Sequence, residues 1–257
     1  MPFKCQYCQG LFCAEHRLPE NHGCPEIWRA KLPKEQAPTP YEFKVTVQPP
    51  RPSTKFGFSI IEARDLVISA LLVSGVGLSI APTGALRLLT SQPEVVITLM
   101  LVFTASFLIH EMAHKITAQR YGLWAEFRLT LWGALITLIS IISPFFKIIS
   151  PGAVMIAGVA DKETIGKTAI SGPLTNMVIC VGSFALTFIV PSWNPFFDVV
   201  LLAAAFNAFI AALNLIPFGM FDGWKVFQWS KVVWALAFIS SIAIAFEIFT
   251  FYSIRLF

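Results

Sequence analysis

The sequence predicts an α-helical polytopic membrane protein, with about five spans, a re-entrant strand or loop region and a small Cys/His-rich domain at the N-terminus. Hydrophobic residues make up 56% of the chain and charged residues 13%, whereas a soluble domain is about half apolar and a quarter charged. The mean hydropathy is +0.69. The composition is also uneven, because residues 1–64 are polar and residues 66–257 hold nearly all the long apolar runs.

The first domain is expected at residues 1–26, where four cysteines alternate with two histidines. Such spacing indicates either disulfides or a metal site. The histidines favour a metal, and metal thiolates imply the reducing side of a membrane. No secretory signal peptide is expected, because these residues lack the apolar core that one requires. The net charge of +4 includes no block of Lys and Arg, so nucleic acid is not an expected partner.

Residues 27–62 are predicted to form a linker. They contain six prolines, a density that excludes a long helix and favours an extended tether. The membrane domain is then expected at residues 63–257. Its charges and prolines divide the apolar sequence into five candidate spans, each long enough for a bilayer core of about 30 Å or close to it. They are Asp65–Ala81, Glu94–Tyr121, 168–190, 197–217 and 231–251.

The stretch 125–159 decides the topology. It contains an alternating segment, Glu126–Leu131, that predicts a strand, followed by an apolar segment that Pro144 interrupts. If the stretch crosses the membrane there are six spans; if it dips in and returns there are five. The re-entrant alternative places most Lys and Arg residues on the side of the N-terminal domain, and positive residues concentrate in cytoplasmic loops. We therefore predict a re-entrant region, a multi-pass protein of the cell membrane and a cytoplasmic N-terminal domain.

The second predicted span contains the motif His110-Glu111-Met112-Ala113-His114. On a helix the two histidines project from one face and could share a zinc ion, with Glu111 placed as general base. The alternative is a functionless cluster near the helix end that pairs with Lys115. Ionisable residues at membrane depth are costly and rarely passive, so the motif favours a catalytic metal site.

A catalytic zinc requires a third protein ligand. Asp222 follows a break in the apolar span at Pro217 and Gly219. In the re-entrant topology it lies on the same side of the membrane as His110. Asp222 could also be an ordinary helix cap. Glu247 is the other intramembrane carboxylate, but it is expected in the outer half of the last span.

This pair of motifs, H-E-x-x-H and Asn214-x-x-Pro217-x-x-x-x-Asp222-Gly, resembles the site-2 protease family of intramembrane zinc metalloproteases. The resemblance covers roughly residues 66–230 and includes Gly172-Pro173-Leu174-Thr175-Asn176. It implies that His110, His114 and Asp222 bind a catalytic zinc and that Glu111 is the general base. Asn176 and Asn214 become candidates for substrate contacts, although both could equally be asparagines that bond neighbouring helices.

The N-terminal cluster resembles an AN-one-type zinc finger. The similarity lies in the spacing of the residues Cys5, Cys8, Cys13, His16, His22 and Cys24. The crossed ligand pattern of that family implies one structural zinc on Cys5, Cys8, His22 and Cys24. In that pattern Cys13 and His16 lack their partners and are the less favoured ligands.

The resemblance implies a zinc-dependent endopeptidase that cleaves transmembrane segments of membrane proteins by metal-activated water. A membrane metalloprotease that acts on soluble or lipidated peptides at the cytoplasmic face is an alternative and would use Glu247 as the third ligand. A non-catalytic membrane adaptor that uses the finger is another. A rhomboid-like serine protease is disfavoured, because it needs a membrane histidine and both belong to the H-E-x-x-H motif. The expected partners are a transmembrane substrate, the lipid bilayer and a cytoplasmic protein bound by the finger.

Overall fold

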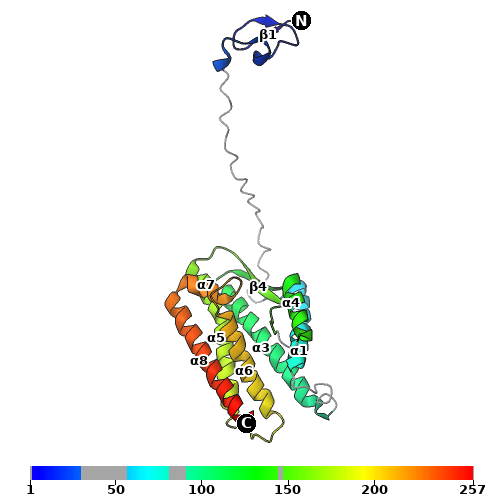
Figure 1. Cartoon of the computed structure of the whole chain (residues 1–257), viewed down its shortest axis with the longest axis vertical. Helices are drawn as coiled ribbons and strands as arrows, with labels where there is room; N and C mark the ends of the chain where they lie inside the picture. Colours follow the sequence, from blue (N-terminus) through cyan, green and yellow to red (C-terminus); the bar gives the residue numbers. More distant parts are fainter. Residues whose placement is uncertain (1, 30–56, 81–90, 144–146, 257) are drawn as a thin grey trace. The chain divides into compact units, whose positions relative to one another are not determined.

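The computed structural model describes residues 2–29, 57–80, 91–143 and 147–256 (Figure 1). The chain divides into two compact units, Met1–Gln48 and Pro49–Phe257. Most of the predicted linker lies outside the described residues.

The first unit has almost no apolar core. Its elements are the paired strands β1 (Phe3–Lys4) and β2 (Leu11–Phe12) and two short 3-10 helices, η1 (Pro19–His22) and η2 (Ile27–Arg29). Within residues 2–29 the buried side chains are Cys5 and Cys24. A domain of this kind depends on a metal or a cross-link for its stability.

The second unit is predominantly helical, as predicted. Its described helices are α1 (Ile60–Ile80), α3 (Pro93–Arg120), α4 (Leu131–Ile142), α5 (Lys162–Leu186), α6 (Phe197–Asn214), α7 (Asp222–Trp229) and α8 (Lys231–Leu256). Helices α3, α5, α6 and α8 pack side by side, and α1 lies between α3 and α4 (Figure 1).

Four of the described helices are long and apolar enough to cross a membrane: α3, α5, α6 and the Lys231–Phe251 part of α8. This is the pattern of a membrane protein, and the four coincide with four of the five predicted spans. The other predicted span corresponds to α1. That helix has 21 residues, but its first two turns carry Glu62, Arg64 and Asp65, so it is not one of the four.

The predicted re-entrant stretch begins with one strand and ends with a second strand that pairs with the first. Strand β3 (Trp124–Leu129) pairs antiparallel with β4 (Gly152–Ala157), with Phe127 opposite Val154. Helix α4, between them, has 12 residues and is about 18 Å long, too short for a bilayer core of about 30 Å. The predicted strand Glu126–Leu131 lies at 124–129 instead. Thr130 still donates its N–H to the Pro151 carbonyl at 3.1 Å, but its side chain caps α4 by accepting a hydrogen bond from Gly133 N–H, and the helix begins at Leu131. Strand β4 was not predicted, since its sequence GAVMIA does not alternate.

The apolar core fixes this small sheet against the helices. Phe103 of α3 stacks on Phe206 of α6, with 3.8 Å between ring centroids, and Phe107 contacts Phe127 of β3 edge-on at 5.9 Å. Phe103 and Phe127 are almost completely buried. Strand β3 is therefore held by the same helix that carries the H-E-x-x-H motif.

Carboxylates of α1 occupy the outer edge of β3. Glu62 Oε1 accepts a hydrogen bond from Phe127 N–H at 3.0 Å, and Asp65 Oδ2 accepts one from Leu129 N–H at 3.2 Å. Glu62 Oε2 also pairs with the Lys115 ammonium at 2.6 Å, and both side chains are buried. With one edge of β3 on β4 and the other on α1, the outer edge of the sheet belongs to β4, where the Val154 amide donates a hydrogen bond to the Glu111 carboxylate.

Candidate metal centre

The H-E-x-x-H motif lies on α3, where four residues make slightly more than one turn. His110 and His114 therefore point the same way, and their Nε2 atoms are 3.1 Å apart. Both rings and Glu111 are buried. The structure brings the two histidines together as the motif predicts.

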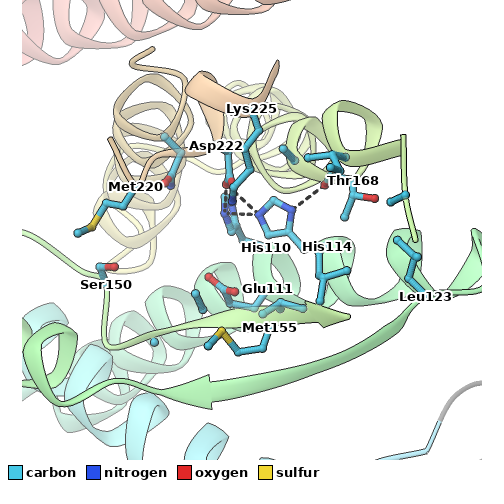
Figure 2. Close-up of a pocket in the computed structure, with 18 of the residues that line it drawn as sticks. His110, Glu111, His114, Leu123, Ser150, Met155, Thr168, Met220, Asp222 and Lys225 are labelled. Carbon is cyan, nitrogen blue, oxygen red and sulfur yellow. Dashed lines mark hydrogen bonds and ion pairs between the residues drawn. The ribbon is translucent and has the colours of Figure 1, made fainter. Parts of the chain in front are cut away.

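Asp222 is the first residue of α7 and completes a group of three possible metal ligands (Figure 2). Its Oδ2 lies 3.0 Å from His114 Nε2 and 3.7 Å from His110 Nε2. Zinc bonds of about 2.0–2.1 Å in tetrahedral geometry separate ligand atoms by about 3.3 Å. The three donor atoms therefore have the chemistry and the spacing that a zinc ion requires.

A glycine of α5 makes room for this group. A Cβ atom on Gly172 would lie 2.3 Å from His114 Nε2 and 2.7 Å from His110 Cε1. Real Cβ atoms do not approach other atoms so closely, so a side chain here would displace the rings. Gly172 was noted in the sequence only as part of a Gly-Pro pair, and the structure shows the steric reason for it.

The other nitrogen of each ring is bonded to a neighbouring helix. His114 Nδ1 lies 2.8 Å from the Thr168 carbonyl, and His110 Nδ1 bonds Asn176 Oδ1. A carbonyl oxygen only accepts, so each Nδ1 carries a proton, and Nε2 is the nitrogen left to bind a metal once it has lost its own proton. Both histidines are thus held in the tautomer that binds a metal.

Lys225 lies one turn after Asp222 on α7, with its Nζ 3.1 Å from Asp222 Oδ1. Burial alone would raise the pKa of Asp222, but His114, His110 and Lys225 outweigh it and hold that pKa well below its usual range. Asp222 is therefore a carboxylate, the form that binds metals. Lys225 was not among the predicted site residues, although a cation three residues after an Asp on a helix is a recognisable pair.

A cavity of about 400 Å³ opens onto this group. Glu111 points into it from α3 and Met155 borders it from β4 (Figure 2). Asn214, at the end of α6, also lines it. A second cavity of about 240 Å³, mostly apolar, adjoins the first and shares Asn214 with it. The space beside the metal group could hold an extended peptide.

The predicted substrate residues occupy different surroundings. Asn214 lines both cavities, as a substrate contact requires. Asn176 is completely buried, and its amide bonds His110 on one side and Asn207 of α6 on the other. The surroundings of Asn176 thus match the alternative role, that of an asparagine that bonds neighbouring helices. Glu247 is exposed on α8 and is not part of the metal group.

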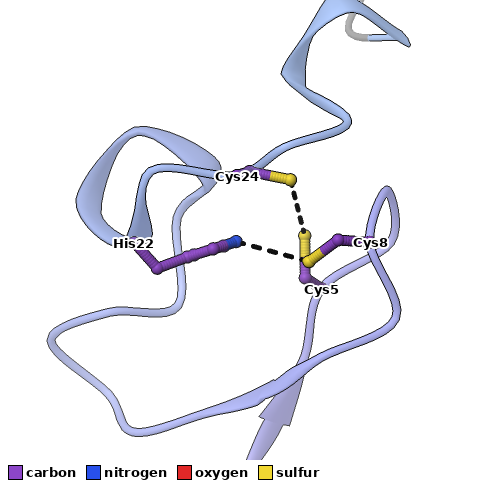
Figure 3. A group of neighbouring side chains, drawn as sticks. All are labelled: Cys5, Cys8, His22 and Cys24. Carbon is purple, nitrogen blue, oxygen red and sulfur yellow. Dashed lines mark hydrogen bonds between the residues drawn. The ribbon is translucent and has the colours of Figure 1, made fainter.

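The N-terminal unit contains a second group of possible ligands: Cys5, Cys8, His22 and Cys24 (Figure 3). The Cys5 and Cys24 sulfurs are 3.9 Å apart, and Cys8 Sγ lies 3.6 Å from His22 Nε2. A tetrahedral zinc with Zn–S bonds of about 2.3 Å gives S–S separations of about 3.8 Å. These are the four residues that the crossed ligand pattern implied.

The remaining pair of the finger stands apart from this group. Cys13 Sγ lies 3.2 Å from His16 Nδ1, and both residues are exposed. Backbone amide hydrogen bonds, chiefly from Cys8, lower the pKa of Cys5 to about 6. Because thiolates are the form that binds metal, Cys5 is ready to bind zinc at neutral pH.

The comparisons with known proteins find a zinc finger family and a zinc metalloprotease. Residues 1–28 match the AN1-like zinc finger family. The chain is also 31% identical, over 186 residues, to the protein named "Putative zinc metalloprotease MJ0611" of Methanocaldococcus jannaschii, covering 70% of this chain and 91% of that protein. The chain belongs to this zinc metalloprotease family.

The finger of this metalloprotease has a human relative. It is 59% identical, over 27 residues, to AN1-type zinc finger protein 1 of Homo sapiens, a match that covers 10% of each protein. The match is confined to the finger, so it carries no information on the membrane domain. No solved structure matches the chain.

Proposed function

We propose that this metalloprotease is an intramembrane endopeptidase, which cleaves transmembrane segments of membrane proteins. The observation that carries the proposal is the place of the metal group on α3, an apolar helix of 28 residues. His110 lies about 26 Å along the helix from Pro93, at about 1.5 Å per residue. If α3 crosses the bilayer, the group is inside the membrane and its substrate must reach it there.

The residues have distinct roles in the proposed reaction. His110, His114 and Asp222 hold one catalytic zinc, and Cys5, Cys8, His22 and Cys24 hold one structural zinc. When bound, the catalytic zinc supplies a Lewis acid that polarises the scissile carbonyl and lowers the pKa of water. Glu111 takes a proton from the attacking water and delivers it to the leaving amine.

The outer edge of β4, where the Val154 amide bonds Glu111, is the proposed substrate platform. The backbone N–H groups of Phe127 and Leu129 point away from β4 and donate to carboxylates of α1. The residues opposite them in the sheet, Val154 and Gly152, therefore have their own N–H and C=O groups pointing away from β3. These groups face the cavity beside Glu111. An unwound transmembrane segment could pair there as an added strand, with Asn214 in contact with its backbone. The outer edge of β3 is not available for this role, because carboxylates of α1 already occupy it.

The topology and the finger complete the proposal. The positive residues favour a multi-pass protein of the cell membrane with the finger in the cytoplasm, where thiols stay reduced to bind zinc. The finger exposes large apolar side chains, Leu11 and Trp28 among them, and its proposed role is to bind a cytoplasmic protein that delivers or controls substrates.

The experiment compares cleavage of two peptides by the protein in liposomes. Both contain the same candidate cleavage sequence, one within a transmembrane segment and one with soluble flanks. We expect cleavage of the transmembrane peptide only, abolished by Glu111→Gln and retained in Glu94→Gln, which changes an exposed carboxylate at the start of the same helix. Equal cleavage by Glu111→Gln would refute the proposal.

The two alternatives make different predictions in the same experiment. Preferential cleavage of the soluble peptide, with zinc lost in Glu247→Gln but kept in Asp222→Asn, would establish the cytoplasmic-face protease. The exposed position of Glu247 argues against this result. Absence of metal from the membrane domain, with partner binding retained by the finger, would establish the adaptor.

A further inference from the structure

A chain of buried hydrogen bonds connects the metal group to the backbone of α6. His110 Nδ1 bonds Asn176 Oδ1, and Asn176 Nδ2 donates to Asn207 Oδ1 at 2.6 Å. Asn207 Nδ2 in turn donates to the Ala203 carbonyl and to Ser106 Oγ, each at 2.9 Å. Asn176 and Asn207 are completely buried. These hydrogen bonds join α3, α5 and α6 and end on the backbone carbonyl of Ala203.

That backbone atom fixes the direction of every bond. The Ala203 carbonyl can only accept, so Asn207 must turn its NH₂ group toward it and its oxygen toward Asn176. Ser106 enforces the same orientation, because its hydroxyl donates to the Val102 carbonyl and therefore accepts from Asn207. Asn176 must then offer its NH₂ group to Asn207 and its oxygen to His110.

We propose that Asn207 is a positioning residue that, through Asn176, sets the tautomer of His110. An acceptor facing Nδ1 places the proton there and leaves the lone pair of Nε2 for the metal. If the Asn176 amide were reversed, its NH₂ group would face Nδ1, the proton would move to Nε2, and His110 could no longer be a ligand. This inference rests on the proposed zinc centre but not on the nature of the substrate.

The apolar surroundings give this orientation its importance. In water a histidine ring exchanges tautomers freely, but here the two amides are fully buried among helices that are apolar enough to lie in a membrane. A reversed amide would leave two acceptors or two donors facing each other without solvent to relieve them, which costs about 1–3 kcal/mol per unsatisfied group. The network therefore favours one tautomer rather than a mixture.

The test compares Asn207→Leu with Asn207→Asp in the full-length protein. Leu has the same branching as Asn but cannot accept from Asn176. Asp keeps one oxygen to accept from Asn176 Nδ2, and in its protonated form, which burial favours, its hydroxyl donates to the Ala203 carbonyl in place of Asn207 Nδ2. We expect Asn207→Leu to bind zinc about 10–100-fold more weakly at the membrane site and Asn207→Asp to retain nearly the affinity of the original protein. A residue needed only for packing would give the opposite order, because an apolar side chain suits an apolar core better than a carboxylate.

Zinc affinity is measured by competition with a chelator, and His110→Ala identifies the membrane site among the metal sites of the chain. Nitrogen-15 NMR of labelled histidine in the metal-free protein reports the tautomer directly, with His110 again assigned by His110→Ala. Asn207→Leu should lose the Nδ1–H signature of His110. Ser106→Ala is the matched control, since it removes one bond of Asn207 but leaves the Ala203 anchor, and it should keep both the tautomer and the affinity.

Unchanged zinc affinity and tautomer in Asn207→Leu would overturn the inference, as would weaker zinc binding in Asn207→Asp than in Asn207→Leu. Neither measurement depends on proteolysis. If no transmembrane peptide is cleaved but the variants follow the expected order of zinc affinity, the proposed function fails and the role of Asn207 stands.

Discussion

At the scale of single residues, the metal centre depends on what surrounds its ligands as much as on the ligands. The two rings of α3 approach each other closely because Gly172 of α5 leaves space for them. Thr168 and Asn176, from the same helix, hold their Nδ1 atoms. One face of α5 therefore shapes the centre without providing a ligand.

This leads to a prediction for Gly172→Ala. The added methyl group would overlap His114 Nε2 and should abolish zinc binding at the membrane site, and cleavage with it. Gly182→Ala on the same helix is the control, because a Cβ there meets no atom within 4 Å. Zinc content and cleavage are measured for both variants. Full zinc binding by Gly172→Ala would show that the rings do not hold the positions described.

The sequence predicted His110, Glu111, His114 and Asp222 because their signals are local. A spacing of four on a helix and a proline break before an aspartate are visible without knowing how helices pack. Asn207, Thr168 and Lys225 were missed, since their importance arises from the rotation of α5, α6 and α7 against α3. The surroundings of Asn176 depend on the same packing, so its sequence motif left two roles open.

At the scale of elements, α1 supports the sheet from behind. Its Glu62 carboxylate is shared between a backbone amide of β3 and the ammonium of Lys115, the residue that follows His114. Lys115 also lies 3.8 Å from the centre of the Phe58 ring. The pair links the metal-bearing helix, the sheet and α1.

We predict that Lys115→Met destabilises the protein by about 3–5 kcal/mol, because it leaves the Glu62 carboxylate buried without a counter-charge. The double variant Lys115→Met with Glu62→Gln should recover part of this loss, since no charge is then buried. Thermal unfolding in detergent measures both. Equal stability of Lys115→Met and the original protein would mean that Glu62 is not buried in the folded state.

The outer edge of β4, the proposed substrate platform, gives another prediction. Ile156 pairs with Ala125 at a position where its N–H points away from β3, so Ile156→Pro removes a donor for the substrate without removing a bond of the sheet. We expect it to reduce cleavage, mainly by raising KM, with zinc content unchanged. Val159→Pro, just beyond the strand, should cleave normally. Normal cleavage by Ile156→Pro would argue against strand addition at β4.

The sequence predicted the strand pair only in part, for a physical reason. Strand β3 alternates because one of its faces packs on Phe107, and alternation is the signal of a half-buried strand. Strand β4 is apolar on both faces, so its sequence GAVMIA resembles that of a short apolar helix. Its outer edge is the available one because α1, which begins about 90 residues earlier in the chain, occupies the outer edge of β3.

At the scale of the whole molecule, the chain combines two metal groups of different chemistry. The finger offers three sulfurs and one nitrogen, a set typical of closed structural zinc sites. The membrane domain offers two nitrogens and one carboxylate beside a cavity, a set typical of catalytic sites with an open position. The division into a small polar unit and an apolar body follows from composition alone, and the match of each part to a different relative agrees with it.

We expect the membrane domain to hold its own zinc, and this zinc to be the one used in cleavage. The most direct measurement is zinc per chain and cleavage of a transmembrane peptide, for the original protein, His110→Ala and Cys24→Ser. We predict two zinc ions in the original protein, and one in each variant. His110→Ala should be inactive, whereas Cys24→Ser should still cleave a peptide presented directly in detergent. Zinc content that is unchanged in His110→Ala, or cleavage that survives this substitution, would contradict a catalytic zinc held by His110.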